Sequence, residues 1–401
     1  MQAPHPARGA NRRLILLLGA LAACGPISVD MYLPSMPSIA QGFGVDQAAV
    51  QLTLTVFMVG FACGMLLYGP LSDAYGRRRL LLAGTAIYAL AGLGCALSPS
   101  IGVLIGLRFV QALGAGAAAV LARAIARDAH APSEAARVMS VLGIVTAVGP
   151  LVAPLVGGQL LLLGGWRAVF VLLSLYGLVS LWAVISRIPE TWPPEKRAPA
   201  ALRNSVRAYL AILRDPLSLG YLLCGCLSFA AMFAYISGTP FVYIEYFHVS
   251  PQHYGLLFAV NIIGMVAFNV FNSRFVGRLG TLRITRVVGT LHALAAVATA
   301  VVALSGLGGL PALAASLFLV VSTVAVLGAN CVTELMHRYS SAAGAAAALF
   351  GALQFLTGSV IGSLVGVFST GTPASMGLLI GACGALAYGG ICLITRRQRA
   401  A

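Results

Sequence analysis

Long apolar stretches alternate with short polar breaks along almost the whole chain. A membrane-spanning helix needs roughly 20 mostly apolar residues, and the sequence offers about twelve such stretches. We predict spans at residues 14–36, 49–69, 80–97, 102–124, 137–162, 167–187, 217–243, 253–273, 286–305, 310–330, 342–367 and 376–395. The pattern therefore predicts an all-α integral membrane protein.

The longest polar segment lies between the sixth and seventh predicted spans and reads IPETWPPEKRAPAALRNSVRAYLAILRDP. Its prolines break helices, and its basic amphipathic end is typical of a helix on a membrane surface. It divides the chain into an N-terminal six-span half (residues 1–187), a cytoplasmic linker (188–216) and a C-terminal six-span half (217–401).

A weak internal repeat supports this division. YGPLSDAYGRRRLL follows the second predicted span, and FNSRFVGRLGTLRI follows the eighth. Duplicated halves around a central site are typical of transporters, although channels and membrane enzymes can also be duplicated.

Composition agrees with the span pattern. The chain is 59% hydrophobic and 9% charged, whereas soluble domains are about 25% charged. The net charge of +15 comes from clusters that all fall on one side of the membrane if both termini are cytoplasmic; only Arg108 and Arg167 fall elsewhere. This is the positive-inside rule, so we do not expect nucleic-acid binding.

Several function classes lack the residues that they need. The eight cysteines form no CxxC pair, and the ten acidic residues show neither paired carboxylates nor metal-ligand spacing, so we expect no enzyme activity, metal or cofactor. No nucleotide-binding loop of the GxxxxGK[ST] type occurs. The energy for transport would then come from an ion gradient, and one isolated carboxylate favours protons over sodium.

Two charged residues fall inside predicted spans. Counted along the helices, Asp30 lies about 25 Å from the inner end of the first span and Arg108 about 12 Å from the outer end of the fourth, so their depths are similar. Membrane charges usually mark function. We hypothesise that Asp30 and Arg108 carry proton coupling, with Arg108 approaching Asp30 in one conformation; a purely structural ion pair is the alternative.

The stretch GPLSDAYGRRR (Gly69 to Arg79) is the most specific local signal. Its glycines permit unusual backbone angles, and a plain topological anchor would explain its arginines but not Asp73. The positive N-terminal end of span 11, behind Ser340 and Ser341, is available to an acidic group. We hypothesise that Asp73 latches the halves together when the site faces outward.

VGPLVAPLVGG in the fifth span suggests a second moving part. Its prolines weaken and bend a helix, and its glycines allow close approach of a neighbour; a kinked packing helix is the simpler interpretation. The predicted conformational switch comprises Gly69, Asp73, Gly76, Arg77, Arg78, Gly149, Pro150, Pro154 and Gly157.

Other buried polar and aromatic residues suit a mainly apolar pocket with a few orienting groups. Taken singly, each is more simply explained by helix packing. The predicted substrate cavity comprises Tyr32, Gln111, Phe233, Tyr235, Asn261 and Gln354. Glu245 and Glu334 fall near span ends, where we expect them to be interfacial.

Several of these stretches resemble a known family. GPLSDAYGRRR is similar to the loop 2–3 signature of the major facilitator superfamily, with Ala74 where a basic residue is usual. RFVQALGAG resembles its span 4 motif, with Ala112 in place of glycine, and VGPLVAPLVGG resembles the span 5 motif of drug/proton antiporters. DMYLPSMP, GWRAVF, SFAAMFAYISGTPFVYIE and FNSRF resemble the bicyclomycin-resistance (Bcr/CflA) branch.

This resemblance implies a fold and a function. The fold would be twelve transmembrane helices in two six-helix halves around a central cavity. The protein would be a monomeric, proton-coupled multidrug antiporter of a bacterial inner membrane. It would export small amphipathic antibacterials such as bicyclomycin, sulfonamides or phenicols. The alternative is a proton-coupled transporter of a small metabolite, by cysteine export or solute uptake.

Overall fold

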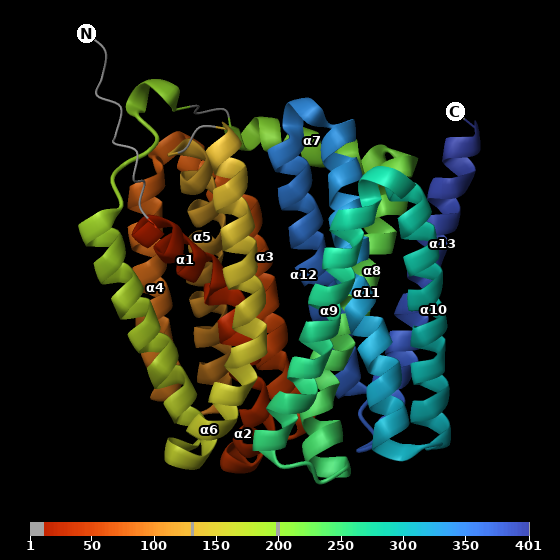
Figure 1. Cartoon of the computed structure of the whole chain (residues 1–401). Coiled ribbons are helices and arrows are strands. Elements are labelled where there is room, and N and C mark those ends of the chain that lie inside the picture. The colour runs from red at the N-terminus through yellow and green to blue at the C-terminus, as the bar shows by residue number, and fades with distance from the viewer. Residues whose placement is uncertain (1–11, 130–131, 198–200, 401) are drawn as a thin grey trace.

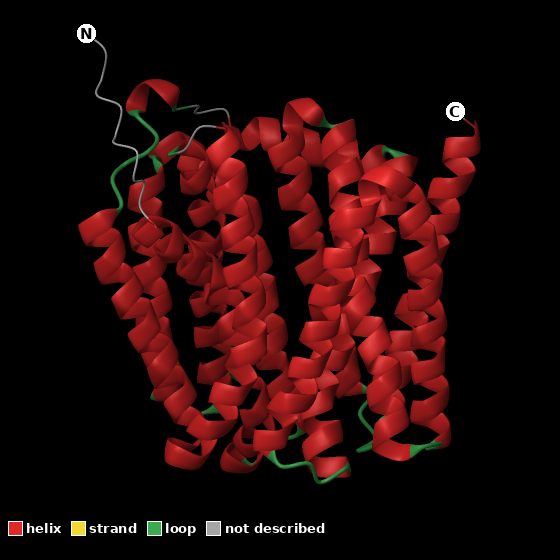
Figure 2. Ribbon diagram, viewed as in Figure 1, coloured by secondary structure: helices red, strands yellow, loops and turns green. Residues whose placement is uncertain are grey.

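The computed structural model describes residues 12–129, 132–197 and 201–400. Within these ranges the chain is almost entirely helical and forms no strand (Figure 2). The first basic cluster, which begins at Arg8, lies partly outside the described residues. The all-helical class predicted from the apolar pattern is confirmed.

The helices follow one another with short connections. The first group comprises α1 (Arg12–Asp30), η1 (Leu33–Ser35), α2 (Met36–Phe43), α3 (Gln47–Tyr75), α4 (Arg77–Ala96), α5 (Ile101–Asp128) and α6 (Pro132–Arg187). The linker carries η2 (Pro194–Lys196) and α7 (Ala201–Arg214). The second group comprises α8 (Pro216–Thr239), the π-helical η3 (Pro240–Tyr246), α9 (Pro251–Leu279), α10 (Thr281–Ser305), α11 (Gly309–Arg338), η4 (Ser340–Ala342), α12 (Ala343–Val367) and α13 (Ala374–Ala400).

Eleven helical segments in the described ranges are long and apolar enough to cross a membrane. One of them, residues 141–187, has 47 residues, which at 1.5 Å per residue is about 70 Å and far exceeds a bilayer core of roughly 30 Å. Its backbone leaves helical geometry at Gly164 and Gly165, where φ of Gly165 is +66°. This turn divides α6 into two spans and gives the twelve predicted.

The first predicted span, residues 14–36, is not one continuous α-helix. The α-helix ends at Asp30, and the chain continues as the short 3-10 helix η1 and then α2. Pro34 and Pro37 occupy the first turns of these two pieces, because proline suits a helix start but cannot continue the preceding hydrogen-bond ladder. The predicted span is thus present as part of a membrane-capable segment, Leu14–Phe43, but its α-helix ends at Asp30.

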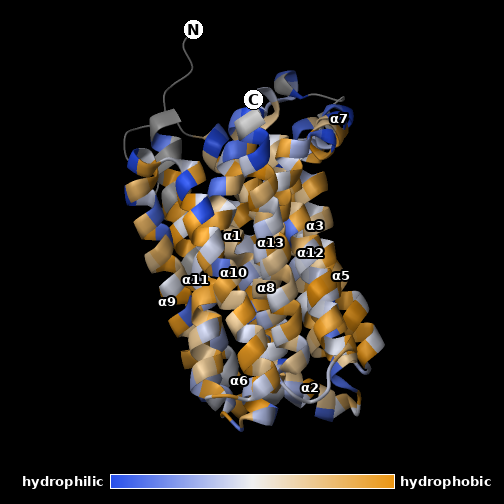
Figure 3. Cartoon of the chain, turned by 90° about the vertical axis from the view of Figure 1, so that its right-hand side faces the viewer, coloured by the Kyte–Doolittle hydropathy of each residue, from blue (hydrophilic) through white to orange (hydrophobic). Residues whose placement is uncertain are grey.

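Several helices extend well beyond their predicted ends. We predicted that the second span ends at residue 69 and the tenth at residue 330, but α3 continues to Tyr75 and α11 to Arg338. Hydropathy marks only the part of a helix inside the hydrocarbon, whereas backbone hydrogen bonds continue into the polar boundary region. Figure 3 shows this pattern, with an apolar middle and hydrophilic residues concentrated at the end that carries α7.

The helices pack as two groups. Helices α1 to α6 contact mainly one another, as do α8 to α13, and the main contacts between the groups are α3 with α12 and α6 with α9. The linker helix α7 and the end of α13 lie at the same end of the bundle (Figure 1). We call this end the linker face and the other end the opposite face.

Candidate functional site

The two helix groups are closed against each other on the opposite face. Gln51 Nε2 of α3 donates to the Ser237 carbonyl of α8 at 2.9 Å. Ser369 Oγ donates to Gln47 Oε1 at 2.7 Å, close to the end of α12. These bonds join the first group to the second near the opposite face, where a smaller cavity of about 280 Å³ lies between Gln47, Gly238 and Ser369.

A larger cavity of about 490 Å³ opens on the linker face. It is lined by α3, α4, α5 and α6 on one side and by α11 and α12 on the other, with α7 contributing Ser205 and Tyr209. Its charged lining residues are Asp73, Arg77, Arg123 and Arg127. The structure therefore has the geometry of a bundle that is open toward the linker face and closed toward the opposite face.

The glycines of the fifth span lie at two close helix crossings. A methyl group added to Gly157 would overlap the carbonyl of Met31, directly after Asp30. A methyl group at the neighbouring Gly158 would lie 2.9 Å from the carbonyl oxygen of Pro251, at the start of α9. Close approach at these glycines, as predicted, lets α6 contact α1 on one side and the second helix group on the other.

The two prolines of the same stretch do not interrupt the helix. Pro150 and Pro154 lie inside α6, and the only non-helical backbone angles within α6 are at Gly164 and Gly165. Whether the prolines control motion stays a prediction.

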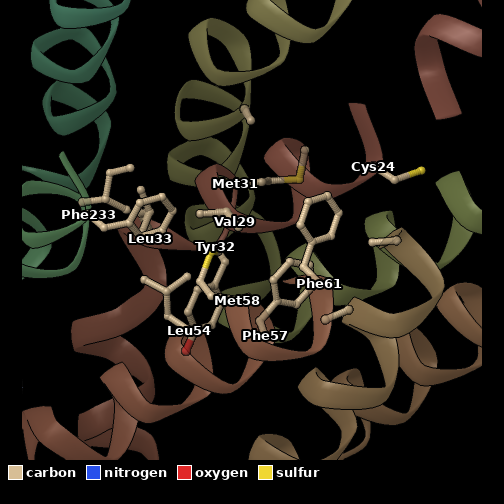
Figure 4. Close-up of a cluster of buried hydrophobic side chains, with 14 of the residues drawn as sticks. Cys24, Val29, Met31, Tyr32, Leu33, Leu54, Phe57, Met58, Phe61 and Phe233 are labelled. Atoms are coloured by element: carbon tan, nitrogen blue, oxygen red, sulfur yellow. The ribbon is translucent and has the colours of Figure 1, made fainter. Parts of the chain in front are cut away.

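Arg108 is fully buried within the first helix group. Its Nη1 donates to Gln111 Oε1 at 2.8 Å, and its Nη2 donates to the Ser28 carbonyl at 3.2 Å. The guanidinium carbon lies 4.2 Å from the ring centroid of Phe57 and 4.9 Å from that of Tyr32; both rings belong to the cluster in Figure 4. Hydrogen bonds and aromatic faces thus hold the charge without a carboxylate.

Asp30 is also buried, with 5% of its surface exposed. It makes no hydrogen bond or ion pair with any residue in the described ranges. Tyr235 of α8 and Tyr254 of α9, both in the second helix group, lie within electrostatic range of its carboxyl, although neither hydroxyl is bonded to it. Asp30 and Arg108 are therefore not paired in this conformation, and the predicted approach of the two charges stays a prediction for another state.

Aromatic rings from both helix groups meet near the middle of the bundle. The ring of Phe61 in α3 lies 4.8 Å from that of Phe355 in α12, between ring centroids. Phe229 of α8 lies 5.2 Å from Phe355 and 5.0 Å from Phe233. We call these four rings the central aromatic cluster. Sequence reasoning identified only Phe233, because apolar rings in a span look the same whether they face a cavity or lipid.

The predicted cavity residues fall into three places. Phe233 belongs to the central aromatic cluster, and Gln354 is the half-buried neighbour of Phe355. Tyr32 and Gln111 contact Arg108 inside the first helix group. Tyr235 and Asn261 are bonded to each other within the second group, with 2.8 Å between Asn261 Nδ2 and the Tyr235 hydroxyl.

The turn between α3 and α4 is shorter than predicted. A turn of about ten residues was expected to need both glycines, but α3 continues through Gly69, whose backbone is helical, and only Gly76 separates the two helices. Gly76 has φ +97°, in the region that favours glycine. The conformational argument was therefore right for Gly76 and wrong for Gly69.

Arg77 joins this turn to α5. Its guanidinium forms ion pairs with Asp73 at 2.6 Å and with Asp128 at 2.9 Å, both within the first helix group. Asp73 and the first residues of α12, Gly344 and Ala345, line the same cavity. The N-cap residue of α12 makes no side-chain hydrogen bond, and Asp73 is paired with Arg77 in this conformation, so contact between Asp73 and the start of α12 stays a prediction for another state.

The linker holds the same turn in a way that sequence reasoning missed. Glu190 Oε1 accepts from the backbone amide of Arg77 at 2.9 Å and Oε2 from that of Arg78 at 3.3 Å, which caps the start of α4. Arg78 in turn donates from Nε to the Ile188 carbonyl at 2.7 Å. The indole of Trp192 covers the Arg77 guanidinium at 4.6 Å and donates to the Asp73 carbonyl. The sequence gives no signal for which distant helix start Glu190 would cap.

The far end of the linker is fixed to the second group. Asp215 caps α8 and accepts from Arg338 Nε at 2.6 Å, at the end of α11. Burial alone would raise the pKa of the Asp215 carboxyl, but hydrogen bonds from Arg338 and Ser218 and the positive charge of Arg338 lower that pKa to about 2. The linker is thus anchored to both helix groups at the cavity mouth.

This architecture is that of a membrane transporter rather than an enzyme. Two helix groups meet at a junction that holds buried polar residues, and a cavity opens on one face. Residues 18–363 match the Major Facilitator Superfamily. The chain belongs to this superfamily, and its relatives support the Bcr/CflA drug-efflux branch. The resemblance inferred from the motifs is therefore confirmed.

Individual relatives extend over nearly the whole chain. An uncharacterised transporter of this superfamily from Bacillus subtilis is 38% identical over 96% of this chain and 97% of its own length. A bicyclomycin resistance protein homologue from Haemophilus influenzae is 34% identical over 92% of each chain. Among solved structures, the chain is similar to the xylose transporter XylE from E. coli, which is described as partially occluded and inward open. The TM-score is 0.72 at 16% sequence identity, and the match covers 94% of this chain and 95% of the XylE chain. This likeness concerns the fold alone.

Proposed function

We propose that this chain is a proton-coupled drug antiporter that works by alternating access. The observation that carries the proposal is Asp30: a buried carboxylate without a partner among the described residues, at the junction of two helix groups that close on one face and open on the other. An ionisable group is costly to bury in a membrane. A proton-driven cycle is a reason to keep it there.

The proposal fixes an orientation. The basic clusters and α7 assign the linker face to the cytoplasm, so the opposite face is outside and the protein lies in a bacterial inner membrane as a monomer. Residues 1–187 and 217–401 are the two moving halves, and residues 188–216 connect them. The conformation described above is then the one that receives drug from the cytoplasm.

The cycle follows from where Asp30 lies. Drug binding from the cytoplasm favours the outward-facing state, in which Asp30 becomes accessible from outside and takes up a proton. The protonated protein returns to the inward-facing state, and Asp30 releases its proton to the cytoplasm. Arg108, held by Gln111 and the Tyr32 ring in the described conformation, carries a permanent positive charge; its approach to Asp30 would favour the ionised carboxylate and therefore belongs to the step in which Asp30 releases its proton.

The substrate site centres on the central aromatic cluster. Phe61, Phe229, Phe233 and Phe355 offer apolar faces from both halves, an arrangement that suits a small amphipathic molecule. We keep Gln354, which precedes Phe355 in α12, as the candidate orienting polar group. Relatives named for bicyclomycin and chloramphenicol resistance support antibacterials of this kind. A small metabolite such as cysteine is the alternative substrate, because the same pocket chemistry is not exclusive to drugs.

The cytoplasmic gate is the α3–α4 turn. We assign Asp73 to a latch: in the outward-facing state its carboxylate contacts the uncapped start of α12, while in the inward-facing state it stays with Arg77. Gly76, Arg77 and Arg78 shape this turn, and the close crossings at Gly149 and Gly157 keep α6 against α1. Pro150 and Pro154 make α6 easier to deform.

A susceptibility panel tests the proposal. In a host that lacks its own efflux pumps, wild type should raise the inhibitory concentration of at least one amphipathic antibacterial, and Asp30→Asn, present in the membrane in equal amount, should not. Drug uptake into inverted vesicles driven by a pH gradient distinguishes export from solute uptake. If no compound is protected and no drug enters these vesicles, the drug-export function is refuted.

A further inference from the structure

One arginine in the cavity on the linker face has no role in the mechanism described so far. Arg123 of α5 lines this cavity, is half-buried, and makes no hydrogen bond or ion pair with any residue in the described ranges. The positive-inside rule explains exposed arginines at the ends of spans. It does not require a guanidinium that lines a cavity between the two helix groups.

Arg123 lies inside the cavity rather than at the end of its helix. α5 crosses α3 at Gly116, where a methyl group added to Gly64 would lie 3.1 Å from the Gly116 Cα. Arg123 is seven positions, or about 10 Å of helix, beyond this crossing toward the linker face. The end of α5 at Asp128 is about 8 Å further on. A molecule in the cavity can therefore reach the guanidinium, which is not confined to the rim.

The acidic side chains at this end of α3 and α5 are already engaged. Asp73 and Asp128 both form ion pairs with Arg77, at 2.6 Å and 2.9 Å. The charged lining of the cavity is one carboxylate, Asp73, against three guanidinium groups, those of Arg77, Arg123 and Arg127. The linker helix α7 at the cavity mouth adds three arginines and no acidic residue. Because a cleft lined by one sign of charge concentrates ligands of the opposite sign, this cavity should attract anions.

The cavity also leads toward the central aromatic cluster. Met65 of α3 lines the cavity and lies one helical turn from Phe61. Ala348 of α12 lines it as well and lies two turns from Phe355, on the same face of that helix. A molecule that enters from the linker face would therefore meet Arg123 before it reaches the rings.

We propose that Arg123 binds the acidic group of an amphipathic substrate, so that the cavity prefers anions such as carboxylates, sulfonates and ionised sulfonamides to neutral molecules of the same shape. This inference rests on the proposed drug-export function and narrows its substrate class. A guanidinium presents several N–H donors in a planar fork, and its hydrogen bonds to an anion are stronger than those between neutral groups. The apolar part of the same molecule would lie toward the central aromatic cluster.

Equilibrium binding to the purified full-length protein in a neutral detergent tests this preference. The two probes are naphthalene-2-sulfonate and naphthalene-2-sulfonamide, which share a ring system and differ by one charge at neutral pH. Wild type should bind the sulfonate more tightly than the sulfonamide. Arg123→Gln should weaken sulfonate binding roughly tenfold, the effect of losing one hydrogen bond to a charged group, and should leave sulfonamide binding unchanged. Arg123→Lys, which keeps the charge but not the fork, should recover part of the loss.

Arg274→Gln is the matched control, because it removes an exposed positive charge from α9 near the linker face without changing the cavity lining. It should leave both affinities unchanged. The inference is overturned if wild type does not bind the sulfonate more tightly than the sulfonamide. It is also overturned if Arg123→Gln weakens both probes equally, or if Arg274→Gln weakens the sulfonate as much as Arg123→Gln does.

The assay contains no pH gradient, so each of these failures leaves the proposed proton antiport standing. Conversely, full gradient-driven efflux by Asp30→Asn would refute the coupling and leave the charge preference of the cavity untouched.

Discussion

Gly158 offers a direct way to bias the two conformations. A Cβ atom added there would lie 2.9 Å from the carbonyl oxygen of Pro251 and 3.4 Å from Cα of Gln252. Both obstacles are backbone atoms of the other helix group and cannot swing away like a side chain. Gly158→Ala should therefore destabilise the conformation in which α6 and α9 touch, that is, the state closed on the opposite face.

The size of the effect follows from the contact. Forcing one methyl group into a close-packed site costs about 1–3 kcal/mol, which corresponds to a roughly 5–150-fold change in a two-state equilibrium. The gain in helix propensity from glycine to alanine, about 1 kcal/mol, applies to both states and cancels. The population open on the opposite face should rise accordingly.

Electron–electron resonance distances between spin labels measure this shift. Labels at Gln41 and Thr370, exposed on the opposite face in different helix groups, should gain a longer-distance population in Gly158→Ala. Gly143→Ala is the matched control, because nothing lies within 4 Å of a Cβ at this position in the same helix. Gly157→Ala strains a contact within one helix group, so it should lower stability without shifting the distances. If Gly158→Ala gives the same distances as Gly143→Ala, the proposed role of this crossing is wrong.

Three further predictions concern the gate, the fifth span and the linker. Asp73→Asn should lower transport and favour the inward-facing state, because the outward-facing state loses the latch, whereas in the inward-facing state Arg77 keeps its second ion pair with Asp128. Unchanged cysteine labelling on both faces together with full transport would refute it. Replacing both Pro150 and Pro154 by alanine should slow turnover more than it weakens substrate affinity, and normal turnover would mean that the prolines only pack. Asp215→Ala should cost about 1 kcal/mol through the lost helix cap. In the folded protein the pKa of the Asp215 carboxyl is depressed to about 2. Its contribution to stability is therefore complete above the unfolded pKa near 3.8 and is lost only as the pH falls toward 2. Thermal melts at pH 5.5 and 8 should show the same loss of stability.

Hydropathy alone predicted the all-helical class and the membrane-capable helices. Helix ends were less predictable, because α3 and α11 keep their hydrogen bonds beyond the hydrocarbon boundary, where residue type no longer reports on structure. The end of the α-helix at Asp30 could have been predicted from Pro34 and Pro37, which suit helix starts. The single-residue turn at Gly76 could not have been predicted, because the length of this turn depends on how far α3 continues.

The charged residues show a different limit. Counting along helices gave similar depths for Asp30 and Arg108, but depth says nothing about the direction in which a side chain points around its helix. Arg108 donates to the Ser28 carbonyl of its own helix group, and the Asp30 carboxylate has no hydrogen-bond partner among the described residues. Likewise, the contacts of Glu190 with the start of α4 join residues more than 110 positions apart, and no local pattern encodes such a pairing.

The central claim is that Asp30 carries the coupled proton. It is tested most directly in proteoliposomes with an imposed pH gradient, by measuring drug efflux and substrate-induced proton release for wild type, Asp30→Asn and Asp30→Glu. We predict that Asp30→Asn folds and inserts normally but shows neither gradient-driven efflux nor proton release, and that Asp30→Glu retains part of both. Undiminished gradient-driven efflux by Asp30→Asn would show that another group carries the proton.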